Sequence, residues 1–167
     1  MPINTKQVAR RPLAFASLDD ISAELDRIEA AHEAGTLKAN GNWTPAQILD
    51  HLAISFGLSL DGFPPNARPP AILKWIVINF FKKKAVSGAT APAGIPFPRS
   101  VDIFTPSATI SFDDALAKLR RMIARATTGG ERMDKPSPLL GPMTHEQWTG
   151  LHRGHCASHL GFLDPGR

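Results

Sequence analysis

Apolar residues recur every three or four positions in four segments of the chain, which is the period of a helix with one buried face. Each segment begins with Ser or Thr, followed three residues later by an acid or an amide, the signature of a capping box. Glycine or proline follows each segment and is expected to stop the helix. We therefore predict helices over residues 18–34, 45–60, 112–127 and 145–163.

The stretch between the second and third predicted helices has a different pattern. Residues 72–85 are predicted to form a short extra helix, apolar enough to pack on the others, whereas residues 86–107 hold four prolines and are predicted to be an irregular loop. No segment alternates with period two, so no strand is predicted. The predicted fold class is all-α: one four-helix bundle domain over residues 1–167, with a long crossover between its second and third helices.

Composition is that of an ordinary globular protein, with 167 residues, 43% of them hydrophobic and 20% charged. The single cysteine, Cys156, excludes an internal disulfide. We find no signal peptide, and the apolar run 71–81 is interrupted by Lys74 and is too short to span a bilayer. We expect a cytoplasmic protein.

The formal net charge is +4, without the basic stripe or motif of a nucleic-acid-binding protein. Lys82, Lys83 and Lys84 are interpreted as a solvated helix C-terminus, where cations are favoured, rather than as a phosphate or lipid contact. We therefore expect neither a nucleic-acid nor a membrane partner. The apolar segment 72–81 could exceed what one bundle covers, which would favour a homodimer.

Candidate chemistry lies in the histidines. His152, His155 and His159 stand at i, i+3 and i+7 of the last predicted helix and share one face with apolar residues. His51 lies on or beside the apolar seam of the second predicted helix. Because bundle interiors build metal sites from facing helices, we predict that His51, His155 and His159 bind a divalent metal ion. The alternative is that each is a core histidine bonded to a carbonyl group.

Three imidazoles without a carboxylate leave a coordination position open for water or substrate, as in catalytic metal sites. Imidazole ligands suit several metals, and we expect zinc or nickel, with iron or manganese as alternatives. His152 is predicted to orient a ligand or to transfer a proton beside the metal, so it is the candidate catalytic residue.

The motif Gly41-Asn42-Trp43-Thr44-Pro45-Ala46-Gln47-Ile48-Leu49-Asp50-His51-Leu52-Ala53 resembles that of the DinB/YfiT-like superfamily, and within it the chain is similar to a bacterial domain family of unassigned function. The C-terminal stretch with Pro138-Leu139-Leu140-Gly141, Trp148 and residues 151–160 adds to the resemblance. It implies a four-helix bundle with a divalent metal on His51, His155 and His159. Some relatives of this kind are metal-dependent transferases that use low-molecular-weight thiols.

Two function hypotheses follow from these residues. The first is a metal-dependent enzyme of transferase or hydrolase type that activates water or a thiol and acts on a small molecule, which could be a low-molecular-weight thiol. The second is a non-catalytic metal-binding or structural helical bundle. Several conspicuous residues are assigned structural places: His32 and His145 near helix ends, Trp43 and Trp148 in packing, Cys156 as a buried thiol, and Arg153 at the surface.

Overall fold

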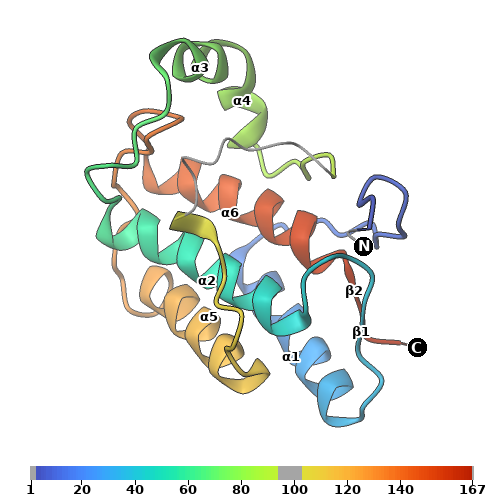
Figure 1. Cartoon of the computed structure of the whole chain (residues 1–167). Coiled ribbons are helices and arrows are strands. Elements are labelled where there is room, and N and C mark those ends of the chain that lie inside the picture. Colours follow the sequence, from blue (N-terminus) through green and yellow to red (C-terminus); the bar gives the residue numbers. More distant parts are fainter. Residues whose placement is uncertain (1–2, 94–102, 167) are drawn as a thin grey trace.

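The computed structural model describes residues 3–93 and 103–166, and these residues are mostly helical (Figure 1). Four long helices supply most of the core: α1 (Leu18–Glu33), α2 (Pro45–Asp61), α5 (Phe112–Ala126) and α6 (His145–Leu160). The four helices predicted from the sequence are confirmed, each with ends within three residues of the observed ones.

The helix starts follow from their capping residues. Ser17, Thr44 and Thr144 each accept a hydrogen bond from the backbone N–H three residues on, and the side chain at that position accepts from the capping residue's own N–H. Ser111 accepts from the N–H of Asp114 and donates its hydroxyl to the Asp114 carboxylate, so the return bond of the box is replaced. Such caps contribute about 1 kcal/mol each.

Helix α2 occupies the centre of the molecule, between α5 and α6, and α1 packs against α5 and α6 (Figure 1). The α2 side chains Leu49, Leu52 and Phe56 are fully buried. Burying each of these contributes about 1.5–3 kcal/mol. Because α2 contacts both neighbours, a side chain on it can face α6 from the inside of the molecule.

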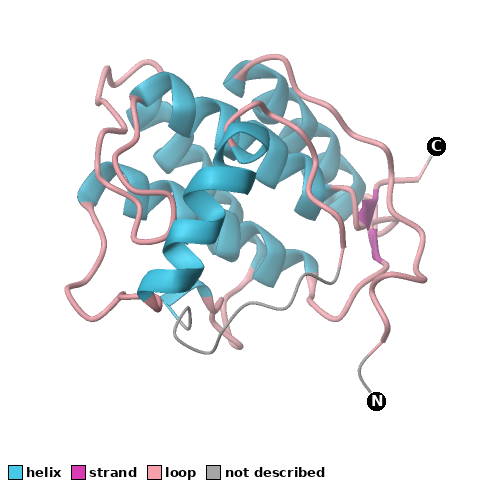
Figure 2. Ribbon diagram, turned by 90° about the horizontal axis from the view of Figure 1, so that it is seen from above, coloured by secondary structure: helices cyan, strands magenta, loops and turns pink. Residues whose placement is uncertain are grey.

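A short antiparallel sheet corrects two predictions. Strand β1 (Lys38–Ala39) pairs with β2 (Leu163–Asp164), so the absence of strands was wrong, and α6 ends at Leu160 rather than continuing to residue 163 (Figure 2). Two-residue strands are too short to show an alternating pattern. Leu163, which was predicted to be the last residue of the helix, instead lies in β2 and is fully buried.

The extra helical segment comprises α3 (Ala71–Ile76), the π-helical turn η1 (Val77–Phe81) and α4 (Lys82–Ala85). Its existence was predicted, and it packs on the other helices as expected, with Val77 and Ala85 against the core. It lies at one edge of the molecule, next to α6, and none of its residues is buried (Figures 1 and 2). An apolar run of this length does not specify from sequence whether anything covers it.

The chain after α4 follows α6 closely. A Cβ atom added to Gly150 would lie 1.9 Å from the carbonyl oxygen of Val86, and one added to Gly154 would lie 2.4 Å from that of Ala89. Two glycines one turn apart therefore let this segment rest directly on the helix backbone. Residues 94–102 of the predicted loop 86–107 lie outside the described residues.

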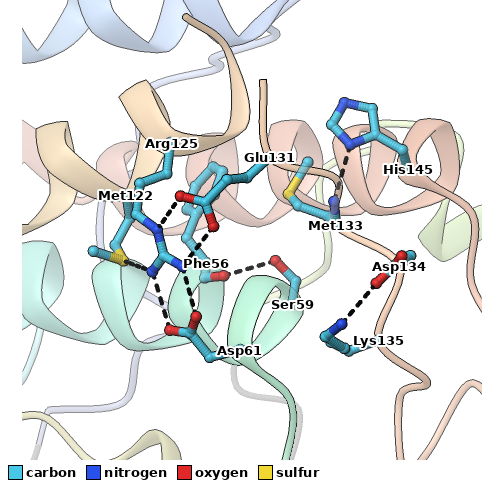
Figure 3. Close-up of polar contacts among 10 residues, drawn as sticks. All are labelled: Phe56, Ser59, Asp61, Met122, Arg125, Glu131, Met133, Asp134, Lys135 and His145. Atoms are coloured by element: carbon cyan, nitrogen blue, oxygen red, sulfur yellow. Dashed lines mark hydrogen bonds and ion pairs between the residues drawn. The ribbon is translucent and has the colours of Figure 1, made fainter. Parts of the chain in front are cut away.

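The end of α2 is tied to α5 by ion pairs. Arg125 donates to both carboxylate oxygens of Asp61, at 2.6 and 3.0 Å, and to both oxygens of Glu131, at 2.8 Å each (Figure 3). The guanidinium lowers the pKa of both carboxyl groups. No helix in the described part of the chain is long and apolar enough to cross a membrane.

Candidate metal centre

His51 reaches the interior from the second turn of α2. The residue is 8% exposed, and the neighbouring Leu49 and Leu52 are fully buried. Trp43, just before the helix cap, lies against the ring with a centroid separation of 4.8 Å. The helix start and the tryptophan together fix where this imidazole points.

His155 and His159 project from successive turns of α6. Their ring centroids are 4.7 Å apart, as expected for side chains four residues apart on a helix. His159 stacks on Trp43 at 5.7 Å, so one indole contacts a histidine from each helix.

The three imidazoles from α2 and α6 converge. Nε2 of His51 lies 3.0 Å from Nε2 of His155, and the centroids of the His51 and His159 rings are 4.6 Å apart. One nitrogen from each ring can be chosen so that all three lie within 4.8 Å of one another. The three histidines predicted as ligands are therefore brought together and could bind a metal ion.

The hydrogen bond on the other side of His51 defines its tautomer. Nδ1 lies 2.7 Å from the carbonyl oxygen of Phe104, and because a carbonyl only accepts, Nδ1 carries the proton. In the neutral ring Nε2 then has a free lone pair, directed at His155. Metal-binding histidines commonly have this arrangement, in which the second nitrogen donates to a carbonyl.

Burial keeps the cluster neutral. It lowers the pKa of His51, lowers that of His155 well below the usual value, and lowers that of His159 to about 3. At neutral pH all three rings are uncharged, which is the form that binds metal. No carboxylate of the described residues joins the group. Asp50, next to His51 in sequence, instead pairs with Lys118 at 2.7 Å.

The donor set fits a metal ion. Two nitrogens bound tetrahedrally to zinc at about 2.0–2.1 Å would lie about 3.3 Å apart. The observed 3.0 Å between His51 and His155 is close to this spacing, and a nitrogen of His159 lies within 4.8 Å of both. Without an ion, the same pair is satisfied if the Nε2–H of His155 donates to His51.

Comparison with known proteins adds one finding. A family model described as a protein of unknown function, DUF1569, matches residues 7–166. The chain belongs to this DUF1569 family. Comparisons with curated proteins and with solved structures give no match.

His152 is separate from the three-histidine group in this DUF1569 chain. Its ring is fully buried between Phe56, at a centroid distance of 3.8 Å, and Trp148, at 5.6 Å. Its Nε2 lies 2.9 Å from Oγ of Ser59. The Ser59 hydroxyl donates to the carbonyl of Phe56 (Figure 3), so Nε2 of His152 carries the proton and donates to Ser59.

This assignment leaves Nδ1 of His152 as a buried acceptor with no hydrogen-bond partner among the described residues. Burial lowers the pKa of the ring to about 3. The predicted role of His152 in catalysis stays a prediction, since the ring contacts Ser59 and two aromatic side chains rather than His51.

His145 and Cys156, which were predicted to be structural, both contact the interior. His145 accepts a hydrogen bond from the N–H of Met133 (Figure 3), and Cys156 is fully buried, which raises the pKa of its thiol. Arg153 differs from its prediction, because it is partly buried and donates to the carbonyl of Phe15. Sequence reasoning missed Phe104, whose contribution is a backbone carbonyl that any residue could supply.

Proposed function

We propose that this chain is a divalent-metal-dependent enzyme of hydrolase or transferase type, with zinc or nickel on His51, His155 and His159; iron or manganese would also suit these donors. The observation that carries the proposal is the oriented His51, with its protonated Nδ1 held by Phe104 and its Nε2 lone pair directed at His155. A core histidine that only bonds a carbonyl group would not need two other neutral imidazoles beside it.

The charge of the site supports catalysis. Three neutral ligands leave the full charge of a divalent ion uncompensated in a largely buried place, which favours an anionic fourth ligand. When bound, such an ion lowers the pKa of a coordinated water toward ~7 or deprotonates a coordinated thiol. A small molecule with a thiol or a hydrolysable bond is the substrate class that this chemistry serves.

The chain's own residues would hold and shield the reacting atoms. His51 is oriented by Phe104, and Trp43 covers one side of the His51 and His159 rings and excludes water there. We assign His152 to proton transfer or to positioning, because its Nε2 is bonded to Ser59 of α2, the helix that also carries His51.

The sequence resemblance to DinB/YfiT-like proteins supports the same proposal. The four long helices would form the four-helix bundle of that superfamily, with the ligands on its second and last long helices, α2 and α6. We include thiol transfer because of this resemblance, and hydrolysis because metal sites with three histidine ligands can activate water.

A structural role for the metal is the second candidate. The donors join α2 to α6, and their burial would suit an ion that clamps the two helices. A clamp predicts that metal raises the melting temperature without any turnover.

The test compares metal-loaded protein with three variants. Wild type, His155→Ala, His152→Gln and the control His32→Gln would be assayed for ester and amide hydrolysis and for thiol transfer from glutathione or cysteine. His32 is exposed and stacks on Phe112, so its loss should leave activity unchanged. Metal-dependent turnover that His155→Ala abolishes supports the enzyme. Metal-dependent stabilisation with no turnover on this panel favours the clamp.

A further inference from the structure

The exposed apolar side chains of this protein are concentrated on one helical segment. Six large hydrophobic side chains are exposed among the described residues, and five of them belong to α3 and η1: Ile72, Trp75, Ile76, Phe80 and Phe81, here called the α3 surface. Their exposed fractions run from 37% to 67%. A cluster of this kind on one element is typical of an interaction site.

The π-helical turn keeps these side chains together. A regular α-helix aligns residues three or four apart, whereas an i→i+5 turn aligns residues five apart. Trp75 and Phe80, five apart, are in edge contact with ring centroids 5.8 Å apart. The turn therefore extends the apolar surface of α3 into η1.

The opposite side of the segment anchors it to the rest of the molecule. Val77 and Ala85 pack against the core, and Lys82 donates to the carbonyl of Pro142 at 2.6 Å. In Figure 1 the segment lies beyond α6 at the edge of the molecule, and Figure 2 shows it from above, lying across the other helices. The α3 surface thus faces outward from a fixed position.

Charge indicates what the surface meets. Residues 62–101 contain six basic residues and no acidic one, a net charge of +6, so the rest of the chain carries +4 − 6 = −2. Lys74, Lys83 and Lys84 are exposed on the same segment as the aromatic side chains. Exposed Trp and Phe beside lysines are the composition of helices that lie in the interface of an anionic bilayer.

We propose that the α3 surface docks on an anionic lipid bilayer, with the aromatic side chains at the level of the headgroups and the lysines against lipid phosphates. The sequence alone favoured no membrane partner, because Lys82, Lys83 and Lys84 were interpreted as a solvated helix C-terminus; the exposed apolar side chains beside them are the reason to propose one. A second copy suits the surface less well, since two such segments would bring their lysines together with no acidic residue between them.

The experiment measures binding of the full chain to vesicles of phosphatidylcholine, with and without phosphatidylglycerol, by co-sedimentation and tryptophan emission. Trp75 is the exposed tryptophan, whereas Trp43 is half-buried and Trp148 buried. We expect binding to anionic vesicles at low salt, a blue shift of the emission, and weakening with added salt. Trp75→Phe should largely remove the shift.

Surface variants identify the binding face. Replacing Lys74, Lys83 and Lys84 with Gln should weaken binding about 100-fold, at about fivefold per lysine. Phe80→Ser with Phe81→Ser should weaken it at least about tenfold. Ile3→Ser, which alters the sixth exposed apolar residue, is the matched control and should leave binding unchanged.

Four outcomes would overturn the proposal. They are no binding of wild type to anionic vesicles at low salt, equal binding to neutral vesicles, a loss with Ile3→Ser equal to that of the phenylalanine variant, or a dimer in solution that the phenylalanine variant dissociates while vesicles stay unbound. The last would assign the surface to a second copy of the chain.

Discussion

Gly154 lets the segment after α4 rest on α6, so Gly154→Ala tests this close contact. The new Cβ would lie 2.4 Å from the carbonyl oxygen of Ala89 and 3.0 Å from its carbonyl carbon. Both atoms belong to backbone, which cannot rotate away as a side chain would. The segment must therefore shift off the helix, away from the hydrogen bond that Ala91 donates to Ser158 at 2.8 Å.

Two effects of opposite sign decide the magnitude. Alanine stabilises a helix interior over glycine by about 1 kcal/mol. Overpacking costs about 1–3 kcal/mol, and the lost hydrogen bond about 1 kcal/mol more. We expect Gly154→Ala to lower the free energy of unfolding by about 1–3 kcal/mol. At about 2–4 °C per kcal/mol, the melting temperature should fall by about 2–12 °C.

A matched glycine in α2 serves as the control. A Cβ on Gly57 would meet the Met122 sulfur at 3.7 Å, an ordinary contact, so Gly57→Ala should gain the helix propensity and raise the melting temperature by about 2–4 °C. Thermal unfolding followed by circular dichroism measures both variants. If Gly154→Ala is stabilised as much as Gly57→Ala, the segment does not rest on α6 in the way described.

Two further predictions concern buried charge. His152 has a pKa near 6.5 in the unfolded chain and about 3 in the folded chain, so the unfolded chain binds one more proton between these pH values. The free energy of unfolding of metal-free protein should therefore fall by about 2 kcal/mol through this group as the pH is lowered to 5. His152→Gln should reduce the pH dependence of the free energy of unfolding, measured by denaturant titration, by one proton. Lys118→Met would leave the buried Asp50 carboxylate with the Ser107 N–H as its one partner among the described residues, and should cost about 2–3 kcal/mol, less than for a fully buried pair because Lys118 is 36% exposed. Adding Asp50→Asn should recover part of that loss; no recovery in chemical denaturation would contradict the pairing.

The helices were predictable because their signals are local. A capping residue and an apolar seam lie within a few residues of each other, and the structure has both at Ser17, Thr44 and Thr144. The candidate ligands were also predictable from local signals, because His51 and His155 each lie among the apolar residues of one helix face.

What the sequence did not specify depends on partners far along the chain. The three α6 histidines share a stripe, yet only two meet His51, because α2 and α6 run antiparallel and His152 therefore faces Ser59, two turns further along α2. The hydrogen bond from His51 to the backbone carbonyl of Phe104 could not be predicted, because any residue at that position has the same carbonyl group.

The central claim is that His51, His155 and His159 bind one divalent ion. Metal analysis after dialysis against zinc and then metal-free buffer tests it most directly, with wild type, His155→Ala and the exposed-histidine control His32→Gln measured side by side. The account predicts one equivalent of zinc in wild type and in His32→Gln, and none in His155→Ala. One equivalent retained by His155→Ala, or none bound by wild type, would contradict it.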